Sequence, residues 1–218
     1  MLTLFFGSSS KAFQMIFMAF VSYKKKDIKV LDVTYGKGRS WEGFVYESLF
    51  QSFSLVKIDK RKYDGVELDV IGDHSDLSCL SSNSFDIVYY DPPYYFKEFV
   101  KSFDLSKSKF EESEVFWSVE EFKKSLAGLR KEVQRLLCDG GFLICKIMDS
   151  YTKKTYFPNT FAVVNNFTLG GLSIVGHFVI PIQKINYPDT IRVNHINYLV
   201  FCKNPSKDWY NCGMSLME

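Results

Sequence analysis

The sequence predicts an α/β domain built on a doubly wound, mostly parallel sheet of seven strands, in which the last strand runs antiparallel. Short apolar runs alternate with segments of helical periodicity, which is the pattern of repeated strand–helix units. The first strands each end at an acid or a glycine turn, whereas the final two are joined without a helix and should pair antiparallel. Because such sheets bind ligands beyond the carboxyl ends of their strands, residues at those ends are the functional candidates.

The N-terminal residues 1–27 are expected to form a helical segment packed on a single domain that spans residues 1–218. Its helix can be capped by a serine of the run Ser8–Ser10 and extends to about Tyr23. The apolar face of this helix follows three- and four-residue spacing through Phe13, Ile16, Phe17 and Phe20. Neither a linker nor an internal repeat marks a second domain.

The first half of the chain predicts the beginning of the sheet. A strand at Ile28–Val33 leads into the glycine-containing turn Thr34–Gly38, and a helix is expected from about Ser40 to Phe53. The next strands are expected at Leu55–Ile58, Val66–Ile71 and Phe85–Tyr90. The first two of these are separated by too few residues for a crossover helix, so either the connection is a bare loop or the strand assignment is wrong.

The second half contains the strongest helical pattern. Apolar residues at three- and four-residue spacing predict a helix from about Ser118 to Cys138, which Asp139-Gly140-Gly141 should terminate. The remaining elements follow in order: a strand at Phe142–Ile147, a helix opened by Pro158 and running through Phe167, and strands at Leu172–Ile180 and Tyr198–Cys202.

Composition restricts the class of protein. The 218 residues are 46% hydrophobic and 24% charged, which fits one globular domain, and no uncharged apolar run is long enough to span a membrane. The net charge of +2 is too small to imply nucleic acid by itself. Contact with a polyanion would therefore depend on local clusters of Lys and Arg.

The cysteines indicate a reducing environment. They form no Cys-x-x-Cys pair, which argues against a zinc site and against a secreted disulfide framework: Cys79, Cys138, Cys145, Cys202 and Cys212. The N-terminus also lacks the basic start and cleavage signal of a secreted protein. We expect no metal, no membrane association and a cytoplasmic location.

The most specific motif is Asp91-Pro92-Pro93-Tyr94, which directly follows the strand predicted at Phe85–Tyr90. On average residue usage such a tetrapeptide arises by chance in about one chain in a thousand of this size. A strand-ending turn with no chemical role is the alternative, because Pro and Asp favour turns.

At these positions the sequence resembles the S-adenosylmethionine-dependent methyltransferases that act on exocyclic amino groups of bases, chiefly N6 of adenine and N4 of cytosine in DNA. Four segments carry the resemblance in the family's order: Val30–Gly38, Asp91–Tyr94, Gly140–Asp149 and Arg192–Lys203. Val33 stands where the family often has proline. The resemblance implies the Rossmann-like class I methyltransferase fold, S-adenosylmethionine as cofactor, and N6 of adenine in DNA as the methylated atom.

The resemblance places the cofactor at the turn after the first strand. Gly36 and Gly38 let the backbone turn sharply and approach a ligand, Thr34 belongs to the same turn, and Asp32 can accept a hydrogen bond from the cofactor's ammonium group. Such a glycine turn can also merely pack a strand against a helix.

Two further acids complete the predicted cofactor site. Asp59 lies at the tip of the second strand, where an acid can bind the two ribose hydroxyls, although it could equally be a solvated loop acid. Asp73 resembles the acid that accepts from the cofactor adenine's amino group, and Asp69 and Asp76 compete with it for that role.

The chemistry expected of the motif follows from the weak nucleophilicity of an amino nitrogen whose lone pair is delocalised into a ring. The Asp91 carboxylate can accept one N–H and the Pro92 carbonyl the other, while Pro93 stiffens the turn. Tyr94 offers a flat face on which the base stacks, and a duplex base must first be flipped out. No Pro-Cys dipeptide offers a covalent nucleophile, so the transfer should be direct.

Residues on the substrate side are predicted with alternatives. Tyr95 and Phe96 extend the aromatic surface or belong to the core. Lys146 lines the substrate side by resemblance, or forms a surface salt bridge with Asp149. Arg192 and His195 precede the last strand, where the same branch of the family carries an Asn-His pair, although a lone histidine is more often structural.

The recognised DNA site should be short, because the chain has no room for a target-recognition domain. Base reading is left to the segments Tyr95–Trp117 and Pro181–Asn197, and the basic stretch Lys24–Arg39 is a candidate for phosphate contacts. The expected partner is nucleic acid, DNA more than RNA, with a homodimer or a specificity partner as further options. The rival hypotheses are the same chemistry on RNA, at adenine N6 or guanine N2, and a catalytically silent binding partner.

Overall fold

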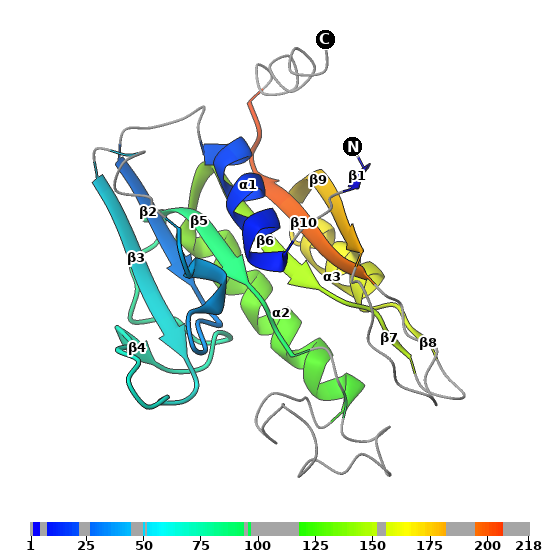
Figure 1. Ribbon diagram of the computed structural model, residues 1–218, viewed down its shortest axis with the longest axis horizontal. Coiled ribbons are helices and arrows are strands. Elements are labelled where there is room, and N and C mark those ends of the chain that lie inside the picture. Colours follow the sequence, from blue (N-terminus) through cyan, green and yellow to red (C-terminus); the bar gives the residue numbers. More distant parts are fainter. Residues whose placement is uncertain are drawn as a thin grey trace.

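The computed structural model describes residues 2–4, 8–21, 27–44, 50, 52–93, 96, 118–151, 156–181 and 195–206. Their core is an eight-stranded sheet of order β1-β9-β10-β6-β5-β2-β3-β4 (Figure 1). Its strands are β1 (Leu2–Leu4), β2 (Asp27–Asp32), β3 (Ser52–Asp59), β4 (Val70–Ile71), β5 (Phe85–Tyr90), β6 (Leu137–Ile147), β9 (Leu172–Pro181) and β10 (His195–Lys203).

The predicted topology is confirmed. Strands β6, β5, β2, β3 and β4 run parallel to one another, and β10 lies antiparallel between β6 and β9. The direct pairing of β9 with β10 follows from their connection without a helix. The parallel strands therefore end at one common edge of the sheet.

The helices cover both faces of the sheet. They are α1 (Ser9–Val21), α2 (Val119–Leu136) and α3 (Asn159–Leu169), together with the short 3-10 helix η1 (Arg39–Trp41). Successive side chains of β5 point to opposite faces: Val88 and Tyr90 pack in the core that α2 and α3 cover, whereas Ile87 and Tyr89 pack in the core that α1 and η1 cover. Figure 1 shows α1 on the opposite face of the sheet from α2.

Helix α2 matches its prediction and ends directly in a strand. The Ser118 hydroxyl caps it by accepting a hydrogen bond from the Glu121 N–H at 3.1 Å. At the other end, Leu137 is both the cap of α2 and the first residue of β6, so β6 begins earlier than the expected Phe142. The Asp-Gly-Gly turn signal lies inside the strand, where the pairing register with β5 shifts and Gly140 has a φ of 68°.

The helix expected from about Ser40 to Phe53 does not have those bounds, and residues 45–49 and 51 of the stretch lie outside the described residues. Among the residues of this stretch that the structure describes, only those of η1 form a helical turn; Gly43 follows with a φ of 69°, and β3 already begins at Ser52. The third strand is also shorter than expected, because only Val70–Ile71 pairs with β3. The expected bare loop between these strands is confirmed, since residues 60–69 contain no helix.

Three strands were not predicted. Within the N-terminal segment, β1 precedes α1 and pairs parallel with β9, so residues 1–27 are not only helical. After β6, the strands β7 (Ser150–Tyr151) and β8 (Tyr156–Phe157) form a small hairpin. Each has only two or three residues, too few for alternation of apolar and polar side chains to be visible.

Among the residues described above, every helix is too short or too polar to span a membrane. The cysteines among them are free thiols: Cys79, Cys138, Cys145 and Cys202. The same residues include no cluster of three or more His, Cys, Asp or Glu side chains that could hold a metal ion.

Close packing of α2 against the loop after β4 gives the first prediction. A Cβ added to Gly128 would overlap the Cβ of Ser75 and lie 3.1 Å from its Cα. We expect Gly128→Ala to lower the free energy of unfolding by about 1 to 3 kcal/mol, the usual cost of overpacking. An unobstructed helical position would instead gain about 0.5 to 1 kcal/mol from the same change.

Urea unfolding of the single variants and of the Gly128→Ala, Ser75→Gly double variant measures this effect. Removing the Ser75 Cβ should make the combined loss smaller than the sum of the single losses. A Gly128→Ala protein more stable than the wild type would contradict the described packing.

Candidate functional site

Four adjacent parallel strands bring the predicted residues to one edge of the sheet. Asp32 ends β2, Asp59 ends β3, Asp91 follows β5, and Lys146 is the second-last residue of β6. The strand order β6-β5-β2-β3 makes these ends neighbours. Such an edge is the usual ligand site of a doubly wound sheet, so the structure confirms that the predicted strand ends converge.

The turn after β2 is held by three hydrogen bonds to the ends of two strands, β2 and β3. The Thr34 N–H donates to Asp32 Oδ1 at 2.9 Å, and the Tyr35 N–H donates to the Ile58 carbonyl at 3.0 Å. The Gly36 N–H donates to Asp59 Oδ2 at 2.8 Å. Asp59 thus supports the turn directly, which a solvated loop acid would not do.

Gly36 and Gly38 differ in the space that a side chain would have at each position. Both have left-handed backbones, with φ of 56° at Gly36 and 72° at Gly38. A Cβ on Gly36 would meet nothing closer than the Thr34 carbonyl oxygen at 3.9 Å, so the backbone borders open space there. A Cβ on Gly38 would lie 2.7 Å from the Tyr35 hydroxyl, so Gly38 is required by packing inside the turn.

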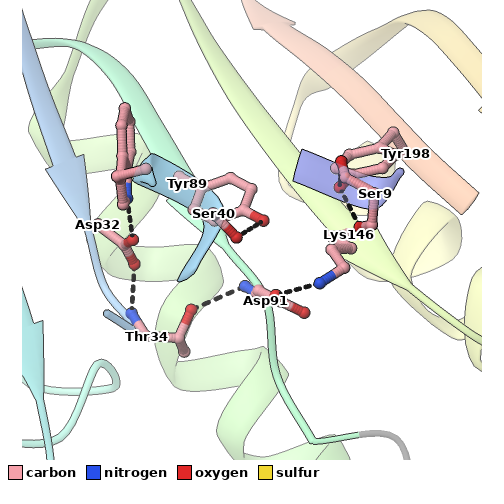
Figure 2. A network of polar contacts seen from close by, with 9 residues as sticks. Ser9, Asp32, Thr34, Ser40, Tyr89, Asp91, Lys146 and Tyr198 are labelled. Carbon is pink, nitrogen blue, oxygen red and sulfur yellow. Dashed lines mark hydrogen bonds and ion pairs between the residues drawn. The ribbon is translucent and has the colours of Figure 1, made fainter. Parts of the chain in front are cut away.

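Asp32 is buried and accepts hydrogen bonds from two groups of the protein, the Thr34 N–H and the Trp41 indole N–H. Its side chain is 1% exposed, and Oδ2 accepts a hydrogen bond from the Trp41 indole N–H at 2.7 Å (Figure 2). Burial raises the pKa of Asp32 to about 7 against the opposing effect of the hydrogen bonds from Trp41 and Thr34, and the negative charges of Asp91 and Asp59 raise it further.

The reaction-centre candidate Asp91 is fixed from both sides. Its backbone N–H donates to Thr34 Oγ1 at 2.7 Å, and its Oδ2 forms an ion pair with Lys146 Nζ at 2.6 Å (Figure 2). The two side chains of the ion pair are 20% and 16% exposed. Pro92 is buried and Pro93 half-buried. Thr34 therefore joins the glycine turn to the Asp-Pro-Pro turn.

Asp73 is distinguished from the competing acids by its contacts. Its Oδ2 pairs with Lys60 Nζ at 2.6 Å, and its Oδ1 accepts from the backbone N–H and the hydroxyl of Ser75. Partial burial alone would raise the pKa of Asp73, but the Lys60 and Ser75 hydrogen bonds outweigh it and hold that pKa well below its ordinary value. By contrast, Asp69 and Asp76 accept backbone N–H groups of Lys57 and Ser78.

The substrate-side predictions are only partly covered. Tyr94, Tyr95 and Arg192 lie outside the described residues. His195 is the first residue of β10 and half-buried. Phe96 is 3% exposed and packs against the rings of Phe122 and Phe157, so it belongs to the core and not to an aromatic binding surface.

The alternative considered for Lys146, a surface salt bridge with Asp149, is not formed, because both side chains have other partners. Lys146 pairs with Asp91, while Asp149 accepts from the Thr160 N–H at the start of α3 and from the Tyr156 hydroxyl. Asp149 thus ties the hairpin β7–β8 to α3. The charge of Lys146 is directed toward the reaction-centre candidate.

Sequence reasoning missed two residues that organise the site. Trp41 was not singled out, although a buried indole N–H requires an acceptor. Asn197 is 2% exposed; its Oδ1 is 2.8 Å from His177 Nε2, and its Nδ2 donates to Thr160 Oγ1 at 3.1 Å. Asn197 therefore orders the beginning of β10, whereas the prediction had emphasised the nearby His195.

Neither family models nor curated proteins match the sequence. Solved structures do match the fold. The PH0226 protein of Pyrococcus horikoshii is 16% identical, with 88% of each chain covered and a TM-score of 0.53. An S-adenosylmethionine-dependent methyltransferase of Methanosarcina mazei is 14% identical over 84% of this chain and 96% of that chain, with a TM-score of 0.50.

A third match concerns a longer protein. TTHA0409 of Thermus thermophilus, described as a candidate DNA modification methylase and solved in complex with S-adenosyl-L-methionine, is 18% identical with a TM-score of 0.44. The match covers 62% of this chain and 54% of that one, so the chain spans about half of its length.

Taken with the strand order, the similarity over nearly the whole chain defines the class of fold. The chain has the class I methyltransferase fold, with an antiparallel strand beside an otherwise parallel sheet and an additional edge strand, β1. The same fold is found in the S-adenosylmethionine-dependent methyltransferase of Methanosarcina mazei. The methylated atom and the nucleic acid are not defined by it.

The burial of Asp32 gives the second prediction. Because its pKa is raised to about 7 in the folded protein, its contribution to stability is largest below about pH 4 and is lost as the pH rises toward and through 7. Asp32→Asn has only one acceptor oxygen for the Thr34 and Trp41 donors, so the variant should be less stable than the wild type at pH 5. Because asparagine does not ionise, the variant lacks the wild type's loss of stability with rising pH, and the difference should shrink by pH 8.

Guanidinium unfolding at several pH values tests this, with Asp27→Asn as the matched control for loss of one negative charge at the exposed start of β2. A difference between wild type and Asp32→Asn that stays constant from pH 5 to 8 would contradict a buried, titrating Asp32.

Proposed function

We propose that the chain is an S-adenosylmethionine-dependent methyltransferase that modifies an exocyclic amino group of a nucleobase, most specifically N6 of adenine in DNA. The observation that carries this proposal is the hydrogen bond between the Asp91 N–H and Thr34 Oγ1. It places a turn with the amino-methylating motif directly beside a glycine turn suited to the cofactor. Both features are needed for methyl transfer to an amino nitrogen.

The cofactor would lie against the turn that contains Thr34 and Gly36, where the missing Cβ leaves open space. Asp59, at the tip of β3, and Asp73, after β4, would bind its ribose and adenine groups. Asp32 would contribute by holding the turn in shape, because its oxygens already accept from Thr34 and Trp41. The bound cofactor supplies an electrophilic methyl group on a positively charged sulfur.

The chain's own contribution to the reaction is to orient the amino group. The Asp91 carboxylate and the Pro92 carbonyl each accept one N–H, which favours a pyramidal nitrogen with its lone pair free to attack. Pro93 restricts the turn, and stacking on Tyr94 would add about 1 to 3 kcal/mol to base binding. No covalent enzyme intermediate is required.

The substrate side of the proposal rests on the sequence. Nucleic acid is the proposed partner, DNA before RNA, with Tyr95, Lys146, Arg192 and His195 toward the substrate. Short segments would read few bases, and a second copy of the chain or a specificity partner would extend the recognition. A cytoplasmic location is consistent with the free thiols among the described residues.

The cofactor site is tested by Gly36→Ala. The added methyl group would enter the open space beside the turn, and we expect S-adenosylmethionine to bind at least about tenfold more weakly, equivalent to about 1.4 kcal/mol. Gly171→Ala is the matched control for backbone strain, since Gly171 has a φ of 85° at the turn before β9, on the opposite edge of the sheet.

Calorimetry with S-adenosylmethionine measures the affinity, and urea unfolding measures the strain. Each alanine should cost about 1 to 2 kcal/mol of stability for its left-handed backbone, but only Gly36→Ala should lose affinity. Equal affinities in both variants and the wild type would place the cofactor elsewhere.

The reaction centre is tested by Asp91→Ala. The hydrogen bond to Thr34 comes from the backbone and survives the substitution, so cofactor affinity should change little. Turnover should fall by about two to three powers of ten, the usual loss when a transition-state hydrogen-bond partner is removed.

Methyl incorporation into single-stranded DNA, duplex DNA and structured RNA separates DNA from RNA activity in the same assay. Asp91→Asn, which retains one acceptor oxygen, should lose less activity than Asp91→Ala. Full turnover by Asp91→Ala on a proven substrate would refute the proposed chemistry, whereas cofactor binding without methylation of any nucleic acid would favour the silent binding partner.

A further inference from the structure

Lys146 and Asp91 present a hydrogen-bond donor and an acceptor side by side at the proposed reaction centre. Their charged groups are 2.6 Å apart, and each side chain retains some exposure at the edge of the sheet, 16% for Lys146 and 20% for Asp91. They come from the neighbouring strands β5 and β6, whose pairing includes Tyr90 with Cys145. Figure 2 shows the Lys146 ammonium directed at the Asp91 carboxylate.

The Lys146 and Asp91 side chains have more hydrogen-bonding positions than their mutual contact uses. An ammonium group carries three donors, and a carboxylate offers about four acceptor positions. Lys146 can therefore keep its contact with Asp91 Oδ2 while it donates to a second acceptor on a ligand. A ligand that bridges the pair needs a donor and an acceptor on adjacent atoms.

Nucleobases differ in this respect. On the Watson–Crick edge of adenine, the N6 amino donor adjoins the N1 acceptor, and in cytosine the N4 amino donor adjoins the N3 acceptor. On the Watson–Crick edge of guanine, the N2 amino group adjoins N1–H, which is a second donor, while its other neighbour, the N3 acceptor, lies on the edge that carries the sugar. A guanine on this edge would point an N–H at an ammonium group and leave both donors unpaired, an expensive arrangement in a partly buried site.

We propose that Lys146 determines base specificity: it donates to the ring nitrogen beside the amino group that Asp91 holds, and so selects adenine or cytosine over guanine. This inference rests on the proposed function. It assigns the Lys146–Asp91 ion pair a recognition role in addition to its structural one.

The test replaces single atoms of the base. Single-stranded DNA oligonucleotides carry one target adenine, one 1-deazaadenine, which lacks the N1 acceptor, or one 7-deazaadenine, which retains N1 and lacks N7. The value of kcat/KM for methylation is measured for the wild type, Lys146→Met and Lys146→Arg. Methionine removes the donors with little change in length, and arginine retains them.

We expect the wild type to methylate 1-deazaadenine about 5- to 150-fold more slowly than adenine, the range of a good base contact, and 7-deazaadenine at nearly the adenine rate. In Lys146→Met the adenine rate should fall, and the difference between adenine and 1-deazaadenine should shrink to the intrinsic difference in reactivity between the two bases. Lys146→Arg should preserve the wild-type difference. The adenine to 1-deazaadenine ratio is compared between variants, because the intrinsic difference in reactivity is the same in each variant and cancels.

Different failures are distinguishable. If the wild type methylates adenine but treats 1-deazaadenine equally, or if Lys146→Met keeps the full difference, the role of Lys146 is refuted while the proposed function stands. Methylation of guanine N2 in the same assay also refutes it. If the wild type binds S-adenosylmethionine but methylates no base amino group, the proposed function fails, and this inference fails with it. Should Lys146→Met not fold, the wild-type ratios and Lys146→Arg still decide.

Discussion

The hydrogen bond from the Asp91 N–H to Thr34 Oγ1 is the contact on which the site depends. It joins the ends of β2 and β5, and it belongs to a longer chain of polar contacts. That chain runs from the Trp41 indole through the Asp32 carboxylate and Thr34 to Asp91, and ends at the Lys146 ammonium. A movement of either turn would break several contacts at once.

The burial of Asp32 explains why this series of polar contacts is costly to break. A buried carboxylate without donors is costly, so the Trp41 and Thr34 hydrogen bonds must be kept for the fold to be stable. The requirement fixes η1 and the glycine turn together, and Thr34 transmits their position to Asp91. Since displacement by about 1 Å can cost on the order of 100-fold in rate, a stable internal network of this kind suits an enzyme that works mainly by orientation.

Much of this arrangement follows from the sequence, because the strand ends are marked by strong local signals. Strand β5 has the predicted bounds, Phe85–Tyr90, since its apolar run is limited by a proline-containing turn. The convergence of Asp32, Asp59 and Asp91 then follows from parallel topology alone. Helix α2 was equally predictable from its apolar spacing.

The remaining features depend on tertiary contacts that local patterns do not contain. The helix expected from Ser40 has the wrong bounds, because the helical turn η1 ends at Trp41, whose indole is held by Asp32, and β3 already begins at Ser52. The glycine pair after α2 is a turn signal, yet β6 absorbs it as an irregularity in its pairing. The partner of Lys146 was also unpredictable, since Asp91 and Asp149 both lie near the same sheet edge.

The central claim is that this site methylates an exocyclic amino group of a base. Mass spectrometry of nucleosides from a methylation-deficient host that expresses the protein tests it most directly, because the product is identified without an assumed target sequence. We expect N6-methyladenine in host DNA, present with the wild type and lost with Asp91→Ala. Methylation found only on a ring carbon or ring nitrogen, or a product that persists in Asp91→Ala, would contradict it.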